Sequence, residues 1–341
     1  MKGMWSTAAR RTATAVAIVA ALGTAAVTVE LAVRAVTRVA GKCHPLCISE
    51  YDPALGWTLA PGTTGRHRHP ELGVDVIYRI DARGARDMTR ARKDVGNRRL
   101  IVLGDSNGFG WGVDYKRHFA AIVQASVPVE VLNLSVSGYG TDQALLRFRS
   151  EGLRFRPAFI VIQVTPNDLD DIQTSWVAGR PKPWFTLNDG ALRLHNVPVG
   201  IEIRDARRMA GQWMPVRFRA WLLKRSFFYH WLNARLPEEP PPTPERARTS
   251  DTSLALFRAL VEEIRTAASA TGATVAVMHA SSEMREHRAQ AIPPGVEVLD
   301  LSDRFQAQGR AFFSDGLHWN EHGHRIAAEA LAEWLVSRQL P

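Results

Sequence analysis

The stretch LIVLGDSNGFGWG (Leu100–Gly112) decides the fold that we expect, because an apolar run passes directly into a polar, glycine-rich turn. Four consecutive aliphatic residues, Leu100–Leu103, are typical of a strand buried on both faces of a parallel sheet. Such a strand ends at the edge of the sheet where open α/β proteins bind their ligands. The turn places Ser106 after Asp105 and before a run of glycines, so it could cradle a phosphate, bend the chain or carry a nucleophile.

The same apolar pattern recurs four times further along the chain. The runs are Val129–Leu134, Ala158–Val164, Ala273–Met278 and Val296–Leu301. Helical periodicity separates or follows them, with one apolar face formed by Leu254, Phe257, Val261 and Ile264 and another by Ala327, Leu331, Trp334 and Leu335. Strands that alternate with helices predict a three-layer α/β/α sandwich around a five-stranded parallel sheet.

The rest of the chain divides into smaller parts. Residues 1–41 form a tail and a signal-anchor helix, and residues 42–98 form a small accessory region with one alternating strand pattern, VDVIYRI (Val74–Ile80). Residues 99–341 form the main domain. We expect an insertion at about residues 172–250 to fold over one edge of the sheet.

The predicted insertion has an unusual composition. It holds five of the ten tryptophans: Trp176, Trp184, Trp213, Trp221 and Trp231. Its basic, aromatic segment Val216–Leu232 fits either a membrane-contacting helix or an amphipathic lid helix packed on the sheet. The following PEEPPPTPE (Pro237–Glu245) predicts an extended, semi-rigid spacer.

The amino terminus predicts attachment to a membrane. Basic residues precede an uncharged stretch, Thr12–Val29, which is long enough to cross most of a bilayer as a helix. Because the apolar pattern continues as far as Val36 without a convincing cleavage context, we expect an uncleaved anchor. Basic residues on the two sides nearly balance, but a short tail is easily left in the cytoplasm. We therefore expect the main domain outside it, in the periplasm or at the cell surface.

Charge and cysteine content exclude some functions and leave others open. The 43 Lys and Arg residues against 34 Asp and Glu give a formal net charge of +9, but no basic run interleaved with aromatic residues is present. We therefore expect no nucleic-acid partner. Cys43 and Cys47 are too few for a disulfide framework or a zinc site, and they fit either one local disulfide or two free thiols.

The glycine-rich turn does not match a nucleotide-binding motif. Neither Gly-x-Gly-x-x-Gly nor a P-loop with Gly-Lys-Ser/Thr occurs there, and we expect no cofactor. A metal site using Asp315, His318, His322 and His324 is conceivable. We expect His322 and His324 to lie in the first turn of the last helix instead, and we predict no metal.

Polar groups after the other strands suggest chemistry when taken together. Gly138, in NLSVSGYGTDQ, can approach a ligand closely, and the Asn167 side chain, in TPND, can donate to an oxyanion. Asp315 is spaced to accept from Nδ1 of His318 and to direct Nε2 outward. With Ser106, these residues supply a nucleophile, three oxyanion donors and an oriented base.

These four blocks resemble those of the SGNH, or GDSL, hydrolase family. The matching residues are Ser106 in GDSN, Gly138 in NLSVSG, Asn167 in PND and His318 in SDGLH, with Asp315 as third triad member. The resemblance covers Leu100–Asp171 and the chain from Val296 onward, and it implies an SGNH hydrolase-like, flavodoxin-like sheet. Ser135 and Pro166 stand where the family often has glycine. The segment YDPALGWTLAPG and the later RGARD also resemble membrane-anchored bacterial members.

The resemblance implies a serine esterase or acylhydrolase. Ser106, His318 and Asp315 would be catalytic, and the Ser106 and Gly138 backbone N–H groups and the Asn167 amide would form the oxyanion hole. The substrate would carry an acyl ester, O-acetyl esters included, on a small molecule, lipid or glycan. Two alternatives stay open, an O-acyltransferase acting on a cell-envelope glycan and a non-catalytic envelope-binding protein. We expect Asp105 and Asp168 to be structural.

Overall fold

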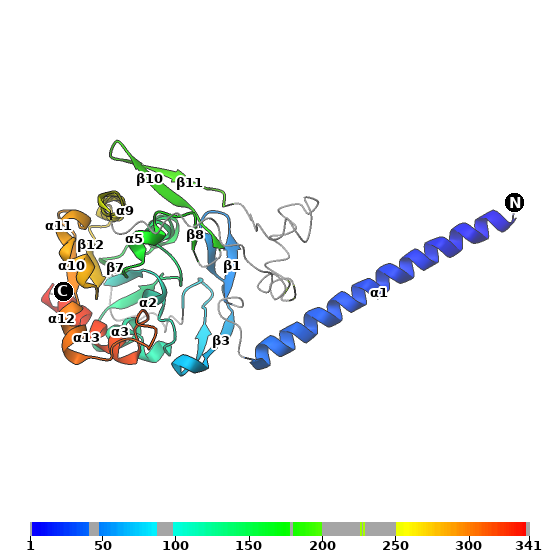
Figure 1. The fold of residues 1–341 in the computed structure, drawn as a ribbon, viewed down its shortest axis with the longest axis horizontal. Coiled ribbons are helices and arrows are strands. Elements are labelled where there is room, and N and C mark those ends of the chain that lie inside the picture. The colour runs from blue at the N-terminus through cyan, green and yellow to red at the C-terminus, as the bar shows by residue number, and fades with distance from the viewer. Residues whose placement is uncertain are drawn as a thin grey trace. The chain divides into compact units, whose positions relative to one another are not determined.

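The computed structural model describes residues 2–40, 48–86, 98–177, 180–199, 226, 228 and 250–338 (Figure 1). Contacts divide the chain into two units, one made of residues 1–42 and 203–237 and the other of residues 43–202 and 238–341. Several sequence predictions lie outside the described residues. They concern Cys43, Cys47, Trp213, Trp221, Trp231, the spacer Pro237–Glu245 and most of Val216–Leu232.

The first unit contains the long helix α1 (Lys2–Ala40). Its segment Arg11–Ala35 is apolar enough and long enough to cross a membrane, a property that a signal sequence shares. Near the end of this segment, the Glu30 carboxylate accepts hydrogen bonds from Ser226 Oγ (2.8 Å) and from the Phe228 backbone N–H (3.0 Å). The predicted apolar amino-terminal helix is therefore present, and its attachment to a membrane stays a prediction.

The second unit is built on a sheet of five strands, all parallel. The strands are β5 (Arg99–Leu103), β6 (Glu130–Asn133), β7 (Phe159–Val164), β12 (Thr274–His279) and β13 (Glu297–Asp300). Their spatial order is β13-β12-β7-β5-β6, so β5, the first strand of this sheet along the chain, lies between the second, β6, and the third, β7. This is the flavodoxin-like order, and each of the five predicted apolar runs contains one strand or overlaps it.

Helices cover both faces of this sheet (Figure 1). On one face lie α4 (Thr141–Arg147) and α9 (Asp251–Ser269), and on the other lie α3 (Phe119–Ser126), α12 (Ser302–Gln308) and α13 (Glu321–Ser337). The predicted three-layer α/β/α sandwich is confirmed. Both predicted helical faces are also present, although Trp334 is only half-buried.

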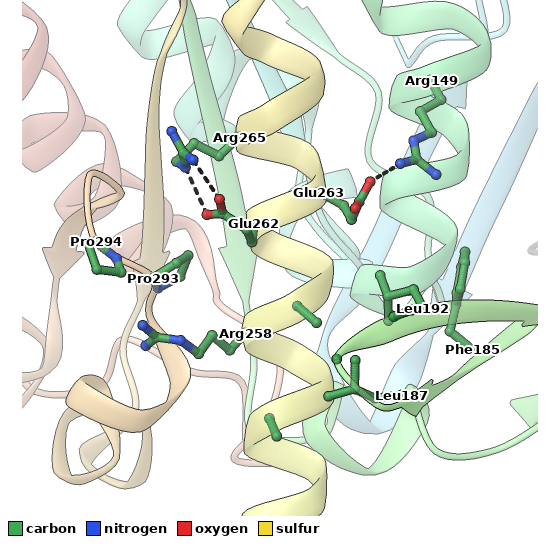
Figure 2. Close-up of a pocket in the computed structure, with 14 residues that line it drawn as sticks. Arg149, Phe185, Leu187, Leu192, Arg258, Glu262, Glu263, Arg265, Pro293 and Pro294 are labelled. Carbon is green, nitrogen blue, oxygen red and sulfur yellow. Dashed lines mark hydrogen bonds and ion pairs between the residues drawn. The ribbon is translucent and has the colours of Figure 1, made fainter.

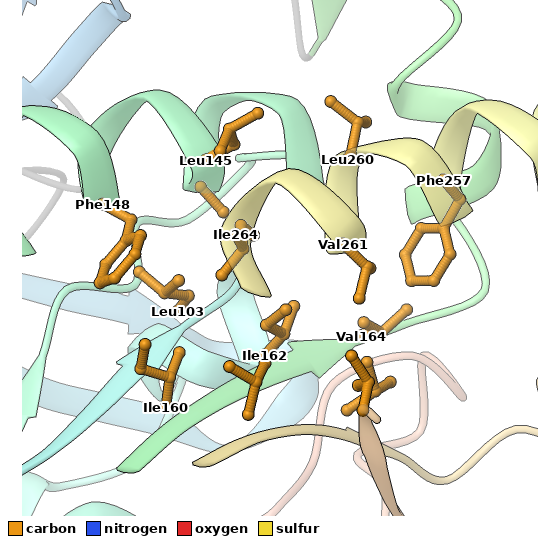
Figure 3. Packing of buried hydrophobic residues seen from close by; sticks show 14 of the residues in the cluster. Leu103, Leu145, Phe148, Ile160, Ile162, Val164, Phe257, Leu260, Val261 and Ile264 are labelled. Carbon is orange, nitrogen blue, oxygen red and sulfur yellow. The ribbon is translucent and has the colours of Figure 1, made fainter. Parts of the chain in front are cut away.

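Alternation along β7 explains how one strand serves both layers. Ile160, Ile162 and Val164 belong to the cluster that packs against α9, whereas Phe159 and Val161 belong to the cluster on the other face. Figure 3 shows Ile162 and Val164 of β7 facing Ile264 and Val261 of α9. A capping box between Ser250 and Ser253 begins α9.

Short elements connect these layers. The short helices are α2 (Ser106–Phe109), α5 (Asp168–Asp171), α10 (Ser282–Glu286) and α11 (Arg288–Ala291). Tighter 3-10 turns span Pro70–Leu72, Tyr115–Arg117 and Leu153–Phe155, and a π turn spans Phe148–Gly152.

Two antiparallel hairpins form the accessory region. They pair β1 (Ser49–Asp52) with β2 (Gly56–Leu59), and β3 (Thr64–His69) with β4 (Val74–Arg79). The predicted strand at Val74–Ile80 is confirmed, because β4 alternates buried and exposed residues along its length. Its buried side chains pack in one cluster with Phe109, Val136 and Tyr139 from the loops after β5 and β6. The accessory region therefore supports the carboxyl edge of the sheet.

Two further hairpins lie in the described part of the predicted insertion. They pair β8 (Trp176–Val177) with β9 (Arg180–Pro181), and β10 (Trp184–Asn188) with β11 (Ala191–His195). Phe185 packs in the same cluster as α9. Beyond β9, the fully buried Lys182 pairs with the equally buried Asp142 of α4. These contacts attach the start of the insertion to the sandwich.

Truncation of Ile162 should test the central position of β7. Ile162 is fully buried, so Ile162→Ala should lower the free energy of unfolding by about 2–5 kcal/mol, and Ile162→Val by only about 0.5–1.5 kcal/mol. Denaturant titration measures both values. Ile77→Ala removes the same atoms from an exposed position on β4 and should cost much less. Equal losses at the two positions would contradict this account of the core.

Candidate active site

The loop after β5 places Ser106 at the first position of α2. The Asp105 carboxylate caps this helix by accepting from the Asn107 N–H (2.8 Å). A Cβ atom at Gly108 would lie 2.5 Å from Ser135 Oγ, so glycine at position 108 leaves room for the serine at position 135. Ser106 itself is 8% exposed, which leaves a hydroxyl in a mostly desolvated turn at the sheet edge.

The loop before α13 holds His318 and Asp315 together. His318 Nδ1 lies 2.6 Å from Asp315 Oδ2, while Asp315 Oδ1 accepts from the Leu317 and His318 backbone N–H groups, each at 3.0 Å. Partial burial acts to raise the pKa of Asp315, but the hydrogen bonds from His318 and the backbone outweigh it and lower the pKa below its usual value. An ionised carboxylate on Nδ1 fixes the imidazole and leaves Nε2 available.

Asn107 connects the serine loop to the histidine loop. Its Nδ2 donates to the Leu317 carbonyl (3.2 Å), and its Oδ1 accepts from the Trp319 N–H (2.7 Å). Because Asn107 follows Ser106 and these two partners flank His318, the loops lie side by side although about 210 residues separate them. Among the described residues, no hydrogen bond joins Ser106 Oγ to His318. Catalytic hydrogen bonds are often long without substrate.

Trp111 stacks on the His318 ring, with centroids 4.1 Å apart and planes 20° apart. The Trp111 backbone N–H donates to the Ser106 carbonyl (2.8 Å), so one residue contacts both loops. Behind it, the His67 ring of β3 contacts Trp111 edge-on at 4.7 Å. Burial, with the neighbouring His69 and His318, lowers the pKa of His67 to about 4, so this ring stays neutral near pH 7.

Gly138 lies in the loop after β6 with a φ of +83°, a conformation that favours glycine. A Cβ atom there would lie 3.4 Å from Trp57 Cζ2 and 3.9 Å from Val177 Cγ1. Trp57 also donates from Nε1 to the Ser137 carbonyl (3.3 Å). The accessory region and the β8–β9 hairpin therefore both border this glycine.

Asn167 lies in the loop after β7, and both ends of its amide are held. Oδ1 accepts from Thr165 Oγ1 (2.7 Å), and Nδ2 donates to Asp171 Oδ2 (2.8 Å). Thr165 Oγ1 also lies 2.5 Å from Asp105 Oδ2, which links the loops after β5 and β7. This orientation leaves one Nδ2–H free of Asp171. The neighbouring Pro166 is exposed and does not enter these bonds.

Two buried acids brace these loops. Asp168 Oδ2 accepts from the Thr165 N–H (2.8 Å), and Asp168 Oδ1 accepts from Thr141 Oγ1 (3.0 Å). Burial raises the pKa of Asp105, and burial together with the charge of Asp105 raises the pKa of Asp168 well above its usual value. The bond from Thr141 joins the loop after β7 to α4.

His322 and His324 lie in the first turn of α13, as expected. His324 is buried, and its ring packs against His118 (4.6 Å) and Phe119 (5.7 Å). In the part of the chain that the structure describes, no three His, Cys, Asp or Glu side chains are grouped to hold a metal ion.

A separate groove of about 960 Å³ runs along the outer side of α9 (Figure 2). Four of its five charged residues form ion pairs, Arg265 with Glu262 (2.5 Å) and Arg149 with Glu263. The fifth, Arg258, donates to the Ile292 carbonyl (2.7 Å). None of the five predicted site residues lines this groove, which belongs to the helical layer.

Three residues of this site were not predicted from the sequence. Asn107 and Trp111 stand inside the opening stretch, but nothing in their spacing indicated that they would meet the carboxyl-terminal loop. Asp171 follows Asn167 by four residues, a spacing that allows side-chain contact on a helix and was the only available signal.

Asp171 should make stability depend on pH. Burial raises its pKa to about 6 from a usual value near 3.8, so the folded state binds more protons between these values. Stability should therefore fall as the pH rises from about 4 to 6, by at most about 3 kcal/mol. Asp171→Asn keeps an oxygen for Asn167 and should raise the free energy of unfolding at pH 8 but not at pH 4. Asp170→Asn controls for loss of a negative charge, and an equal effect of Asp171→Asn at both pH values would contradict the prediction.

Comparisons with known proteins match the part of the chain that contains the parallel sheet. The model of the GDSL-like lipase/acylhydrolase family matches residues 102–326. No curated protein matches the chain. Similar solved structures include TesA, at 15% identity over 72% of this chain and 100% of that chain with a TM-score of 0.41. They also include a lipolytic protein of the G-D-S-L family from Veillonella parvula DSM 2008, at 16% identity over 69% and 96% with a TM-score of 0.36. Because the family model spans well over half of the chain, this protein belongs to the GDSL-like lipase/acylhydrolase family and is a hydrolase that acts on ester bonds.

Proposed function

We propose that this protein is a serine esterase in which Ser106, His318 and Asp315 form the catalytic triad. The observation that carries the proposal is the double hydrogen bond of Asn107, which holds the serine loop against the histidine loop. The 2.6 Å contact between His318 Nδ1 and Asp315 supports the same assignment, because it directs Nε2 away from the carboxylate.

Each triad residue would have a defined step. His318 Nε2 takes the proton of Ser106 as Oγ attacks the ester carbonyl, and Asp315 stabilises the imidazolium that forms. The same imidazolium returns the proton to the departing alcohol. Water, activated by His318, then hydrolyses the acyl-enzyme and frees Ser106. The stack of Trp111 on the His318 ring supports this orientation, since it limits ring rotation about the Asp315 contact.

The oxyanion of the tetrahedral intermediate would be held by three donors. They are the Ser106 and Gly138 backbone N–H groups and the Asn167 side-chain amide. Asp171 and Thr165 fix that amide before substrate arrives, and preorganised donors are the main source of stabilisation in such sites. Asp105 and Asp168 would hold the loops without taking part in a chemical step.

The apolar helix α1 bears on location. We assign it as an uncleaved membrane anchor with the catalytic domain outside the cytoplasm, because its segment Arg11–Ala35 is long enough and apolar enough to cross a bilayer. The ester would then belong to a small molecule, a lipid or an acylated glycan that reaches this compartment.

Labelling with a fluorophosphonate tests the nucleophile directly. Wild-type protein should be labelled and Ser106→Ala should not, with turnover of a 4-nitrophenyl ester falling by roughly 10⁶-fold if the triad acts as a unit. Ser137→Ala, in the loop after β6, is a matched control that retains Ser106. Labelling that persists in Ser106→Ala would overturn the triad.

Asn167→Ala should separate the oxyanion hole from the nucleophile. Loss of one oxyanion donor typically costs about 10²- to 10³-fold in kcat, so this variant should lose turnover while retaining its thermal unfolding transition. Steady-state kinetics on the same ester gives the value. Unchanged kcat would remove Asn167 from the site. Adding a glycan acceptor to the assay distinguishes hydrolysis from acyl transfer, because a transferase would release less free acid.

A further inference from the structure

The β8–β9 hairpin brings Arg180 to the border of the site. Arg180 of β9 pairs directly with Val177 of β8, and directly paired residues of antiparallel strands place their side chains on one face. Val177 Cγ1 lies 3.9 Å from the position of a Cβ atom on Gly138. Arg180 therefore shares a face with a side chain that contacts the proposed oxyanion glycine.

The Trp57 ring also places Arg180 close to Gly138. The Arg180 guanidinium lies over the Trp57 ring, 4.5 Å from its centroid. The Cζ2 edge of the same ring lies 3.4 Å from the Cβ position of Gly138. One indole therefore separates the cation from the oxyanion hole, and a substrate bound at Gly138 would lie within reach of Arg180.

Arg180 has no anionic partner within the described residues. No ion pair or hydrogen bond from its guanidinium occurs there, although the group carries five N–H donors. The contrast with Lys182 is direct, because Lys182 is fully buried and paired with Asp142. Burial lowers the pKa of Arg180 to about 10, so the group remains a cation at neutral pH. Arg180 is half-buried, and the contact with the Trp57 ring is the one interaction of its charge that the described residues provide.

We propose that Arg180 binds an anionic group carried by the substrate close to the scissile ester. This inference rests on the proposed triad and oxyanion hole, and it names the substrate class as esters that bear a carboxylate or a phosphate. A guanidinium fork pairs with either group through two parallel hydrogen bonds, which an ammonium cannot reproduce. The anion would pair with Arg180 as Asp142 pairs with Lys182.

Matched ester pairs test this preference. One pair places the charge on the alcohol side, 4-acetoxybenzoate against its methyl ester, and 4-acetoxyphenyl phosphate adds a phosphate arm. The other pair places it on the acyl side, mono-4-nitrophenyl succinate against 4-nitrophenyl butyrate. In at least one pair, Arg180→Gln should lower the ratio of kcat/KM for the anionic over the neutral ester by about 10- to 100-fold, as expected for a lost charge-assisted hydrogen bond. Arg180→Lys should recover only part of the ratio.

Arg193→Gln is the control, because it removes the same charge from an exposed position on β11. It should leave the ratio unchanged. An Arg180→Gln variant that loses activity on charged and neutral esters equally, or that keeps the wild-type ratio in both pairs, overturns the inference and leaves Arg180 a structural partner of Trp57.

Failure of the proposed function has a different signature. If wild-type protein cleaves none of these esters but is labelled at Ser106 by a fluorophosphonate, labelling rates with carboxylate-bearing and neutral fluorophosphonates replace kcat/KM in the same comparison. Equal Arg180→Gln effects on both rates then overturn the inference. If Ser106 is not labelled, the proposed triad is wrong, and the inference about Arg180, which rests on the triad, is overturned as well.

Discussion

The meeting of β5 and β7 at the carboxyl edge of the sheet is the constraint on which the site depends. The chain reverses direction of travel across the sheet between these two strands, so the loops that follow them diverge and leave room for a ligand. Ser106 and Asn167 stand in these two loops. Thr165 Oγ1, 2.5 Å from Asp105 Oδ2, ties one loop to the other. The positions of the buried strands therefore determine where Ser106 and Asn167 lie.

Groups far apart in the chain complete this edge. Asn107 fastens the carboxyl-terminal loop to the serine turn, and Trp111 stacks on His318 while the β3–β4 hairpin supports it from behind through His67. The two small hairpins of the accessory region thus help to orient the His318 imidazole. They lie outside the four sequence blocks that resemble the family. An altered hairpin would therefore affect the position of the His318 ring as well as stability.

Burial of charge divides the polar residues of this edge into two classes. Lys182 and Asp142 form an ion pair inside the protein, and Asp105 and Asp168 are held by hydrogen bonds that offset only part of their lost hydration, since the pKa of each stays raised. Arg180 is half-buried, and among the described residues it contacts the Trp57 ring but no carboxylate. In a hydrolase, a charged group without a partner beside the proposed oxyanion hole is a natural place for substrate recognition, since the ligand then supplies the missing partner.

The sequence by itself determined the sheet, its two helical layers and the family. Runs that are apolar at nearly every position have few alternatives to strands buried on both faces, and the spacing of Leu254, Phe257, Val261 and Ile264 allows one helical face. It also brought Ser106, Gly138, Asn167, Asp315 and His318 forward as candidates. Only the tertiary structure decided what surrounds them. The contacts of Asn107, Trp111 and Arg180 depend on how separate loops approach one another, and local periodicity does not reveal partners that lie tens or hundreds of residues away.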